Sequence, residues 1–265
     1  MVEYRIVRGI KLAFEWIGNG EELIVFLHGV GADRTSWEPQ VKFFSDAGYS
    51  VAAIDMRGTG LSQSRDDNGL ALPITIADFA ADVHELIPSL GFERAHWVGN
   101  SMGGVIIMEA FRQQFPTIAK AVLTNTFAKY PDSHLILPRP ANAVRTKSLS
   151  EFAAERIPFA HRPDISPEIL AASIRAMATK DVETYLLSWR ETWSHDYRGV
   201  LSEVRVPSLV ITGSVDKITP PALGLEIAGL IPNAAYHEIK NASHLSNLDQ
   251  PKEFNQVVLE FLKKP

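Results

Sequence analysis

Short apolar runs alternate with helix-like segments along much of the chain. Apolar or β-branched runs between turn residues are typical of strands covered on both faces. Such runs predict strands at residues 3–7, 11–17, 23–27, 49–54, 96–98, 119–123, 208–212 and 235–239. Periodicity and end signals predict helices at residues 37–46, 76–87, 102–113 and 252–262. This alternation predicts βαβ units and a parallel sheet, so the fold class is α/β.

The alternation stops for one long segment in the second half of the chain. Residues 128–204 contain no strand-like run, and the segment begins irregularly, at Pro131, Pro138 and Pro140. Helical patterns then follow near residues 149–156, 167–179 and 182–193. We therefore predict one doubly wound core domain, residues 1–127 and 205–265, interrupted by a helical cap, or lid, at 128–204.

Composition excludes several kinds of chemistry. The 265 residues are 46% hydrophobic and 22% charged, which is typical of a globular protein. A net charge of −5 gives no reason to expect nucleic-acid binding. The absence of cysteine excludes disulfides, thiolate metal sites and cysteine nucleophiles. We find no metal motif and expect no cofactor. The charged N-terminus and the lack of long apolar runs predict a cytoplasmic protein without membrane segments.

A serine stands at a predicted junction between a strand and a helix. The segment Gly99-Asn100-Ser101-Met102-Gly103 matches the pattern G-x-S-x-G. On such a sharp turn the serine hydroxyl is exposed above the sheet edge, and the glycines leave room for the turn. The alternative is a glycine-rich turn with an incidental serine, so the rest of the chain has to supply supporting residues.

A serine nucleophile needs a base, and the base needs an acid that orients it. Asp216 follows the strand predicted at 208–212, and His244 follows the strand predicted at 235–239. Both lie at carboxyl ends of strands, where open α/β sheets bind ligands. The chain order Ser101, Asp216, His244 is the order associated with this serine motif.

The other histidines and acids fit these roles less well. His237 lies within a predicted strand, and His84 and His96 precede the serine; the cap contains His134, His161 and His195. Asp181 and Asp196 also belong to the cap, and Asp249 follows the histidine. Asn125 stands at the other place for a triad acid, but an amide cannot do that work.

The loop after the first buried strand supplies a fourth component of the expected catalytic site, beside the serine, the acid and the histidine. It reads His28-Gly29-Val30-Gly31. Backbone N–H groups of Val30 and Met102 are the expected oxyanion hole. His28 is expected to have a structural role. A dinucleotide-binding interpretation fails, because Arg34 and Gln63 occupy the positions of the last glycine in the two G-x-G-x-x-G candidates.

Together these segments resemble the α/β-hydrolases over almost the whole chain. The matching landmarks are His28-Gly29, Asp55-Met56-Arg57-Gly58-Thr59-Gly60-Leu61-Ser62, Gly99-Asn100-Ser101-Met102-Gly103-Gly104, Gly213-Ser214-Val215-Asp216 and Ala242-Ser243-His244. The resemblance implies a mostly parallel eight-stranded sheet with a helical cap inserted after the sixth strand. Epoxide hydrolases and haloalkane dehalogenases resemble this fold but have aspartate where this chain has Ser101.

Two subgroups of the family compete. The stretch 123–128 and the ending 244–251 resemble 3-oxoadipate enol-lactone hydrolases, whereas residues 99–104 also resemble the C–C bond hydrolases of meta-cleavage pathways. The latter typically have tryptophan after the catalytic histidine, where this chain has Leu245. Enol-lactonases often lack the His-Gly pair that this chain keeps. We expect a serine hydrolase of esters or lactones in aromatic degradation; a C–C hydrolase and a slow-turnover receptor are the alternatives.

The cap is expected to set specificity for a small ester or lactone. We expect Phe127, Tyr130, Arg145, Trp189 and Trp193 to contact substrate, with Tyr185 as a further wall. Aromatic residues in a helical lobe more often pack its own core. Arg139 and Arg190 are further candidates for a substrate carboxylate, although the cap's charge is nearly balanced. The sequence leaves a homo-oligomer open.

Overall fold

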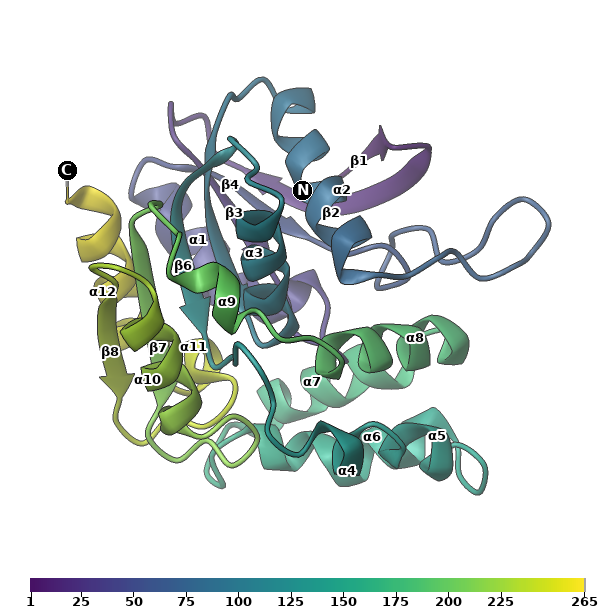
Figure 1. The fold of residues 1–265 in the computed structure, drawn as a ribbon. Coiled ribbons are helices and arrows are strands. Elements are labelled where there is room, and N and C mark those ends of the chain that lie inside the picture. The colour runs from purple at the N-terminus through teal and green to yellow at the C-terminus, as the bar shows by residue number, and fades with distance from the viewer. Residues whose placement is uncertain (265) are drawn as a thin grey trace.

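A single mixed sheet forms the centre of the molecule in the computed structural model, which describes residues 1–264. Its strands are β1 (Val2–Val7), β2 (Ile10–Ile17), β3 (Leu23–Leu27), β4 (Ser50–Ile54), β5 (Ala95–Asn100), β6 (Ile118–Thr124), β7 (Ser208–Gly213) and β8 (Ala235–Ile239). They lie in the order β1-β2-β4-β3-β5-β6-β7-β8. β2 pairs antiparallel with β1 and β4, and the remaining pairs are parallel (Figure 1).

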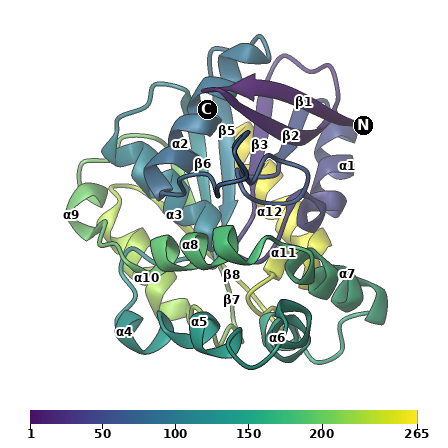
Figure 2. The same ribbon diagram turned by 90° about the vertical axis from the view of Figure 1, so that its right-hand side faces the viewer.

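Helices cover both faces of this sheet. One face carries η1 (Arg34–Trp37), α1 (Glu38–Asp46), α11 (Ser246–Asp249) and α12 (Pro251–Lys263). The other face carries α2 (Ile76–Ser89), α3 (Met102–Arg112), α9 (Arg198–Leu201) and α10 (Pro221–Leu230). Figure 2 shows α1 and α12 on one side of the strands, with α2 and α3 on the other. The mostly parallel, doubly covered sheet confirms the predicted fold class.

A further group of helices lies between β6 and β7 in the chain. We call α4 to α8 the cap helices: α4 (Ser133–Ile136), α5 (Arg139–Ala143), α6 (Leu149–Arg156), η2 (Ile157–Ala160), α7 (Pro167–Ala178) and α8 (Val182–Trp193). They form a layer along the carboxyl-end edge of the parallel strands (Figure 1). α9 follows them in the chain but packs against α3 and α10.

The longer cap helices begin where a side chain can satisfy free backbone amides. Ser148 caps α6 in a capping box with Glu151, Ser166 caps α7, and Asp181 caps α8. Each side chain accepts a hydrogen bond from an amide that has no partner within its helix. The three predicted cap helices therefore form close to their predicted ranges.

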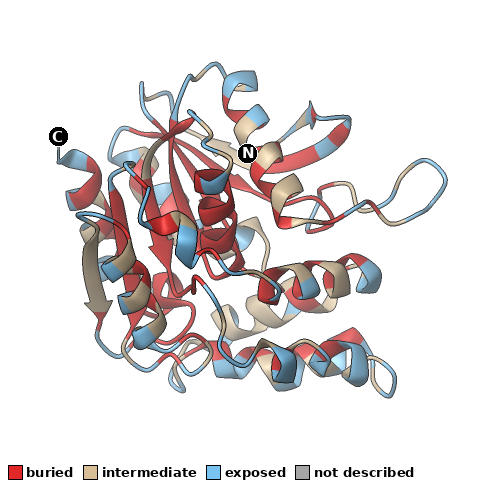
Figure 3. Ribbon diagram, viewed as in Figure 1, coloured by how far each residue is buried: buried red, intermediate tan, exposed pale blue. Residues whose placement is uncertain are grey.

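Two apolar cores lie on opposite faces of the sheet. β3 and β4 are buried at every position, as a strand covered on both faces requires (Figure 3). Trp37 and Phe44 from the α1 side contact Phe26 at centroid distances of 4.9 and 5.8 Å. No helix within residues 1–264 has the length and apolar character needed to cross a lipid bilayer.

Strand register brings three loops to one level. Leu27, at the end of β3, pairs with Ile54 of β4 and Gly99 of β5. On the far side of β5, Asn100 pairs with Thr124. The segments that follow these strands therefore start side by side at the edge covered by the cap helices, where ligands bind in open α/β sheets.

Candidate active site

Ser101 occupies a strained turn between β5 and α3. Its φ is 52°, in the region that favours glycine, and a non-glycine residue there costs about 1–3 kcal/mol. The turn is held because the Ser101 amide donates to Thr124 O at 2.9 Å and the Ser101 carbonyl accepts from Thr126 Oγ1 at 2.8 Å. The predicted strand-to-helix context of the serine is therefore present.

Two glycines make this turn sterically possible. A Cβ at Gly99 would lie 2.3 Å from the Gly103 carbonyl carbon, and a Cβ at Gly103 would lie 2.1 Å from Leu27 O. Both contacts are with backbone atoms, which cannot move aside as a flexible side chain can. The G-x-S-x-G spacing is thus required by the close approach of α3 to the sheet.

Asp216 and His244 lie together at the carboxyl ends of β7 and β8. His244 Nδ1 is 2.9 Å from Asp216 Oδ2, and both side chains are almost fully buried. The other oxygen, Oδ1, accepts from the amides of Ile218 and Thr219 at 2.8 and 3.0 Å. Burial acts to raise the pKa of Asp216, but the charge of His244 and hydrogen bonds from His244 and Thr219 outweigh it and lower the pKa.

Asn125 also belongs to this group, in a supporting role that its place in the sequence does not indicate. Its Nδ2 donates to Asp216 Oδ2 at 3.0 Å, and its Oδ1 accepts from Ser246 Oγ at 2.6 Å. Thr219 Oγ1 also lies 2.7 Å from Asp216 Oδ2. An amide cannot replace the triad acid, but here it supports the acid that is present.

Asn100 links the serine turn to the histidine loop. Its Nδ2 donates to the carbonyl of His244 at 3.0 Å and to Thr124 Oγ1 at 3.2 Å. Within residues 1–264, Ser101 and His244 share no hydrogen bond between their side chains. Such catalytic bonds are often long without substrate and shorten when it binds.

Two backbone amides beside Ser101 are free to bind an anion. Met102 is the first residue of α3, so its N–H has no acceptor within the helix. The Val30 N–H, in the loop after β3, likewise has no backbone acceptor within residues 1–264. A Cβ at Gly29 would lie 3.2 Å from Ser101 Cβ, so this loop directly contacts the serine.

His28 fixes the shape of this loop. Its ring nitrogens lie 2.9 Å from Gly29 O and 3.0 Å from Thr59 Oγ1, and its side chain is fully buried. Burial, with help from the charge of Lys180, lowers the pKa of His28 to about 4. The imidazole is therefore neutral at physiological pH, as the structural role predicted for His28 requires.

The motif at residues 55–62 braces the neighbouring loop. The Asp55 carboxylate accepts hydrogen bonds from the Arg34 side chain at 2.6 Å and from the Leu61 amide at 2.8 Å. A Cβ at Gly60 would lie 2.2 Å from Asp55 Oδ2, so only glycine fits there. This landmark therefore supports the site without entering it.

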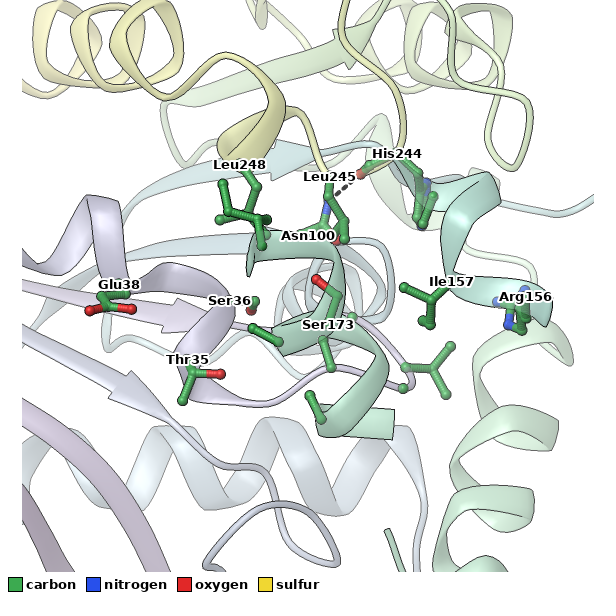
Figure 4. A pocket seen from close by; sticks show the side chains of 18 of the residues that line it. Thr35, Ser36, Glu38, Asn100, Arg156, Ile157, Ser173, His244, Leu245 and Leu248 are labelled. Atoms are coloured by element: carbon green, nitrogen blue, oxygen red, sulfur yellow. Dashed lines mark hydrogen bonds between the residues drawn. The ribbon is translucent and has the colours of Figure 1, made fainter. Parts of the chain in front are cut away.

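A cavity of about 130 Å³ opens beside His244. Its walls include Val30 and Asn100 from the core, and Arg156 and Ser173 from the cap helices. Figure 4 shows Asn100, Arg156 and Ser173 around the cavity. Thr35, Ser36 and Glu38 add polar groups on the η1 side. Large parts of the remaining wall are apolar, formed by Ile157, Ala160, Ile169, Ala172, Ala176, Ile218, Leu245 and Leu248. Of the predicted triad and oxyanion residues, His244 and Val30 line this cavity between core and cap, and Ser101, Asp216 and Met102 do not. Asn100, the residue before Ser101, also lines it.

The aromatic residues predicted for the pocket divide into two groups. Tyr130, Trp189 and Trp193 line a second cavity, of about 450 Å³, beneath the cap helices. Phe127 is fully buried and stacks on Trp193 at a centroid distance of 4.9 Å. It therefore packs against a residue of the cavity wall and does not line either cavity itself. Tyr185 is also buried and lines neither cavity.

Arg156, and not Arg145, is the arginine on the wall of the cavity beside His244. Arg145 lies in the turn after α5 with its side chain in solvent, and it borders neither cavity. Arg156 lines both cavities and places its guanidinium 4.4 Å from the Trp189 ring centroid. A sequence signal existed: Arg156 continues the stripe of Leu149 and Ala153, the buried positions of α6.

A model of the α/β-hydrolase fold matches residues 22–251 of the chain. The chain belongs to the α/β-hydrolase family. In this α/β-hydrolase, Ser101 follows β5, Asp216 follows β7 and His244 follows β8. No group of three or more His, Asp or Glu in the described part of the chain is arranged to hold a metal ion.

Similar proteins include both subgroups considered from the sequence. A 3-oxoadipate enol-lactonase from Acinetobacter baylyi is 30% identical, over 92% of this chain and 91% of that protein. A 2-hydroxy-6-oxononadienedioate/2-hydroxy-6-oxononatrienedioate hydrolase from Burkholderia vietnamiensis is 28% identical, over 96% of this chain and 92% of that protein. The crystal structure of an enol-lactonase from Burkholderia xenovorans matches with a TM-score of 0.90 and 30% sequence identity. The match covers 99% of this chain and 100% of that chain. The resemblance of this α/β-hydrolase to enol-lactonases is therefore confirmed.

Proposed function

We propose that the protein cleaves a carboxylic ester or lactone through an acyl-enzyme on Ser101. The observation that carries this proposal is the buried Asp216–His244 hydrogen bond of 2.9 Å, beside a cavity that His244 lines together with Asn100, the residue before Ser101. An ionised acid that holds a histidine beside a serine turn is the arrangement that serine hydrolysis requires.

The reaction follows in two halves. Ser101 Oγ attacks the carbonyl carbon while His244 Nε2 takes its proton, and the Val30 and Met102 amides stabilise the oxyanion. The carbonyl re-forms, the C–O bond to the alcohol breaks, and His244 returns the proton to the leaving oxygen. Water then adds to the acyl-enzyme with His244 again as base, which releases the acid and restores the serine.

An anionic substrate fits the cap side of the site. Arg156 forms no ion pair with a carboxylate in the described residues, and burial lowers the pKa of its guanidinium without removing its charge. Arg139 and Lys217 also line the second cavity. The one acid there, Glu155, is held by Lys147 at 2.6 Å. We infer that a carboxylate on the substrate binds Arg156, as a lactone or ester with an acidic arm would permit.

A second activity is supported by similarity to the oxononadienedioate hydrolase. That protein is named for an oxo-dienedioate substrate, and a serine site can add to a ketone carbonyl as it adds to an ester. Leu245 borders the cavity next to His244, where the C–C hydrolases of this resemblance typically have tryptophan. We therefore place the C–C activity second.

The test is a comparison of substrates by kcat/KM. An enol-lactone with a carboxylate arm, aryl esters and a vinylogous 1,5-diketone are assayed with the purified protein and with Ser101→Ala. We expect the lactone or the esters to be hydrolysed fastest, with the loss of Ser101 lowering their turnover at least about 10³-fold. Cleavage of the diketone alone would overturn the ester and lactone assignment.

A further inference from the structure

A second serine, histidine and aspartate are joined by hydrogen bonds across the boundary between cap and core. The Ser173 hydroxyl lies 3.0 Å from Nε2 of His161, and Nδ1 of His161 lies 3.2 Å from Oδ1 of Asp249. The side chains of His161 and Asp249 are fully buried. Ser173 belongs to α7, His161 follows η2, and Asp249 ends α11. The mechanism proposed above uses none of these three groups.

Of these three hydrogen-bonded side chains, Ser173 is the one that reaches the substrate cavity. Ile169, Ala172, Ser173 and Ala176 line the cavity beside His244, and their spacing places them on one face of α7. The other three side chains are apolar, so Ser173 is the polar position on that wall. Figure 4 shows Ser173 and His244 around the same cavity.

Asp249 fixes which group donates and which accepts in the hydrogen bonds from Ser173 through His161 to Asp249. Its Oδ2 accepts from the amides of Ser243 and Arg162 at 2.7 and 3.3 Å. A carboxylate only accepts, so the tautomer of His161 with one ring proton carries that proton on Nδ1, toward Oδ1. Nε2 is then an acceptor, and the Ser173 hydroxyl donates its one hydrogen to it. Ser173 therefore presents only lone pairs to the cavity.

Ser173 lacks what would make it a second nucleophile. It lies in the interior of a twelve-residue helix, where backbone amides are used by hydrogen bonds along the helix. No oxyanion hole of the Val30 and Met102 kind is available from α7. Cap and core are also joined without Ser173, because the Leu245 amide donates to Ala160 O at 3.0 Å. The geometry therefore favours a role for Ser173 in substrate recognition, rather than in catalysis or in holding the cap to the core.

We propose that Ser173, oriented by His161 and Asp249, is a hydrogen-bond acceptor that selects substrates with a hydroxyl or N–H group. This subsite deepens the proposed function, because its ligand is the substrate of Ser101. A hydroxylated acyl chain satisfies the lone pairs of Ser173. A carbonyl at the same place meets an acceptor and is rejected.

Turnover of matched esters tests the proposal. The probes are p-nitrophenyl hexanoate, its 2-, 3- and 6-hydroxy derivatives, and the corresponding oxo derivatives. We expect at least one hydroxy ester to exceed hexanoate in kcat/KM, and Ser173→Ala to lower that ratio about three- to tenfold. Ala172→Ser combined with Ser173→Ala is the matched control: it restores a hydroxyl to the same wall without the His161 bond and should not restore the ratio.

Asp249→Asn makes the sharper test. The amide oxygen can keep the bonds from Ser243 and Arg162, which turns the NH2 group toward His161 Nδ1. The imidazole proton then moves to Nε2 and points at Ser173, and the freed serine hydrogen can donate into the cavity. We expect the preference to reverse toward the oxo esters. An unchanged hydroxy-to-hexanoate ratio in Ser173→Ala would overturn the proposal, whether or not Asp249→Asn folds.

Binding to Ser101→Ala separates this proposal from the proposed function. Calorimetry with the free hydroxyhexanoates and hexanoate needs no catalysis. Tighter binding of a hydroxy acid that is lost in Ser101→Ala/Ser173→Ala supports the subsite even if wild-type protein hydrolyses no ester. Equal binding of all the acids contradicts the subsite even if every ester is hydrolysed.

Discussion

The Asp216 carboxylate lies 2.9 Å from Nδ1 of His244, and its second oxygen is occupied by two backbone amides. Those amides, from Ile218 and Thr219, determine how an amide at position 216 would orient. In Asp216→Asn the oxygen would face them and the NH2 group would face His244. The imidazole would then hold its proton on Nε2, where it cannot accept one from Ser101.

We therefore predict that Asp216→Asn lowers kcat about 10⁴-fold while the protein stays folded. Steady-state kinetics on the best ester, together with a thermal unfolding curve, checks this. Asp46→Asn, an exposed substitution in α1, is the control and should leave kcat unchanged. A loss of less than tenfold in Asp216→Asn would show that Asp216 does not orient the histidine.

Arg156 is predicted to recognise a substrate carboxylate. We expect Arg156→Met to lower kcat/KM about 10- to 100-fold for an ester with a carboxylate arm, relative to its neutral methyl ester, because a charge-assisted hydrogen bond is lost. Arg145→Met removes the same charge from the cap surface and should leave that ratio unchanged. Equal losses for the charged and neutral esters would assign Arg156 a packing role on Trp189 only.

Lys180 makes stability depend on pH above neutrality. Its ammonium, at the end of the α7 segment, donates to Ala32 O at 2.7 Å, and burial lowers its pKa from 10.5 to about 8. Between those values the unfolded chain holds a proton that the folded chain has lost, so rising pH favours the folded state.

Relative to Lys180→Met, the wild-type free energy of unfolding should therefore rise between pH 8 and 10.5, by up to about 3 kcal/mol. Denaturant unfolding of both proteins at several pH values measures this difference. The tyrosines and arginines titrate equally in the two proteins, so their effects cancel. Parallel stability curves would mean that Lys180 titrates normally in the folded protein.

Most of the fold could be predicted because burial leaves a direct trace in the sequence. β3 is apolar at all of its positions, and α6 and α8 carry both a cap residue and a periodic face. α4, α5 and α9 are only four or five residues long, too short for periodicity to appear. α10 begins with proline and is nearly uniformly apolar, so it lacks an amphipathic pattern.

Chain order and strand ends are the signals from which the sequence predicts Ser101, Asp216 and His244. Ser101, Asp216 and His244 each follow a strand, so the topology alone brings them to one edge. The cap residues were harder, because helix packing decides which face turns inward. Arg156 and Ser173 each share a helical face with apolar residues, and that signal separates them from the exposed Arg145.

Covalent trapping tests the central claim most directly. An aryl fluorophosphonate reacts with a serine that a neighbouring histidine activates, and intact-mass measurement followed by peptide mapping locates the adduct. We predict one adduct per chain on Ser101, its prevention by a slowly hydrolysed ester, and no adduct in Ser101→Ala. An adduct that maps to another residue, or rapid ester hydrolysis by Ser101→Ala, would contradict the account.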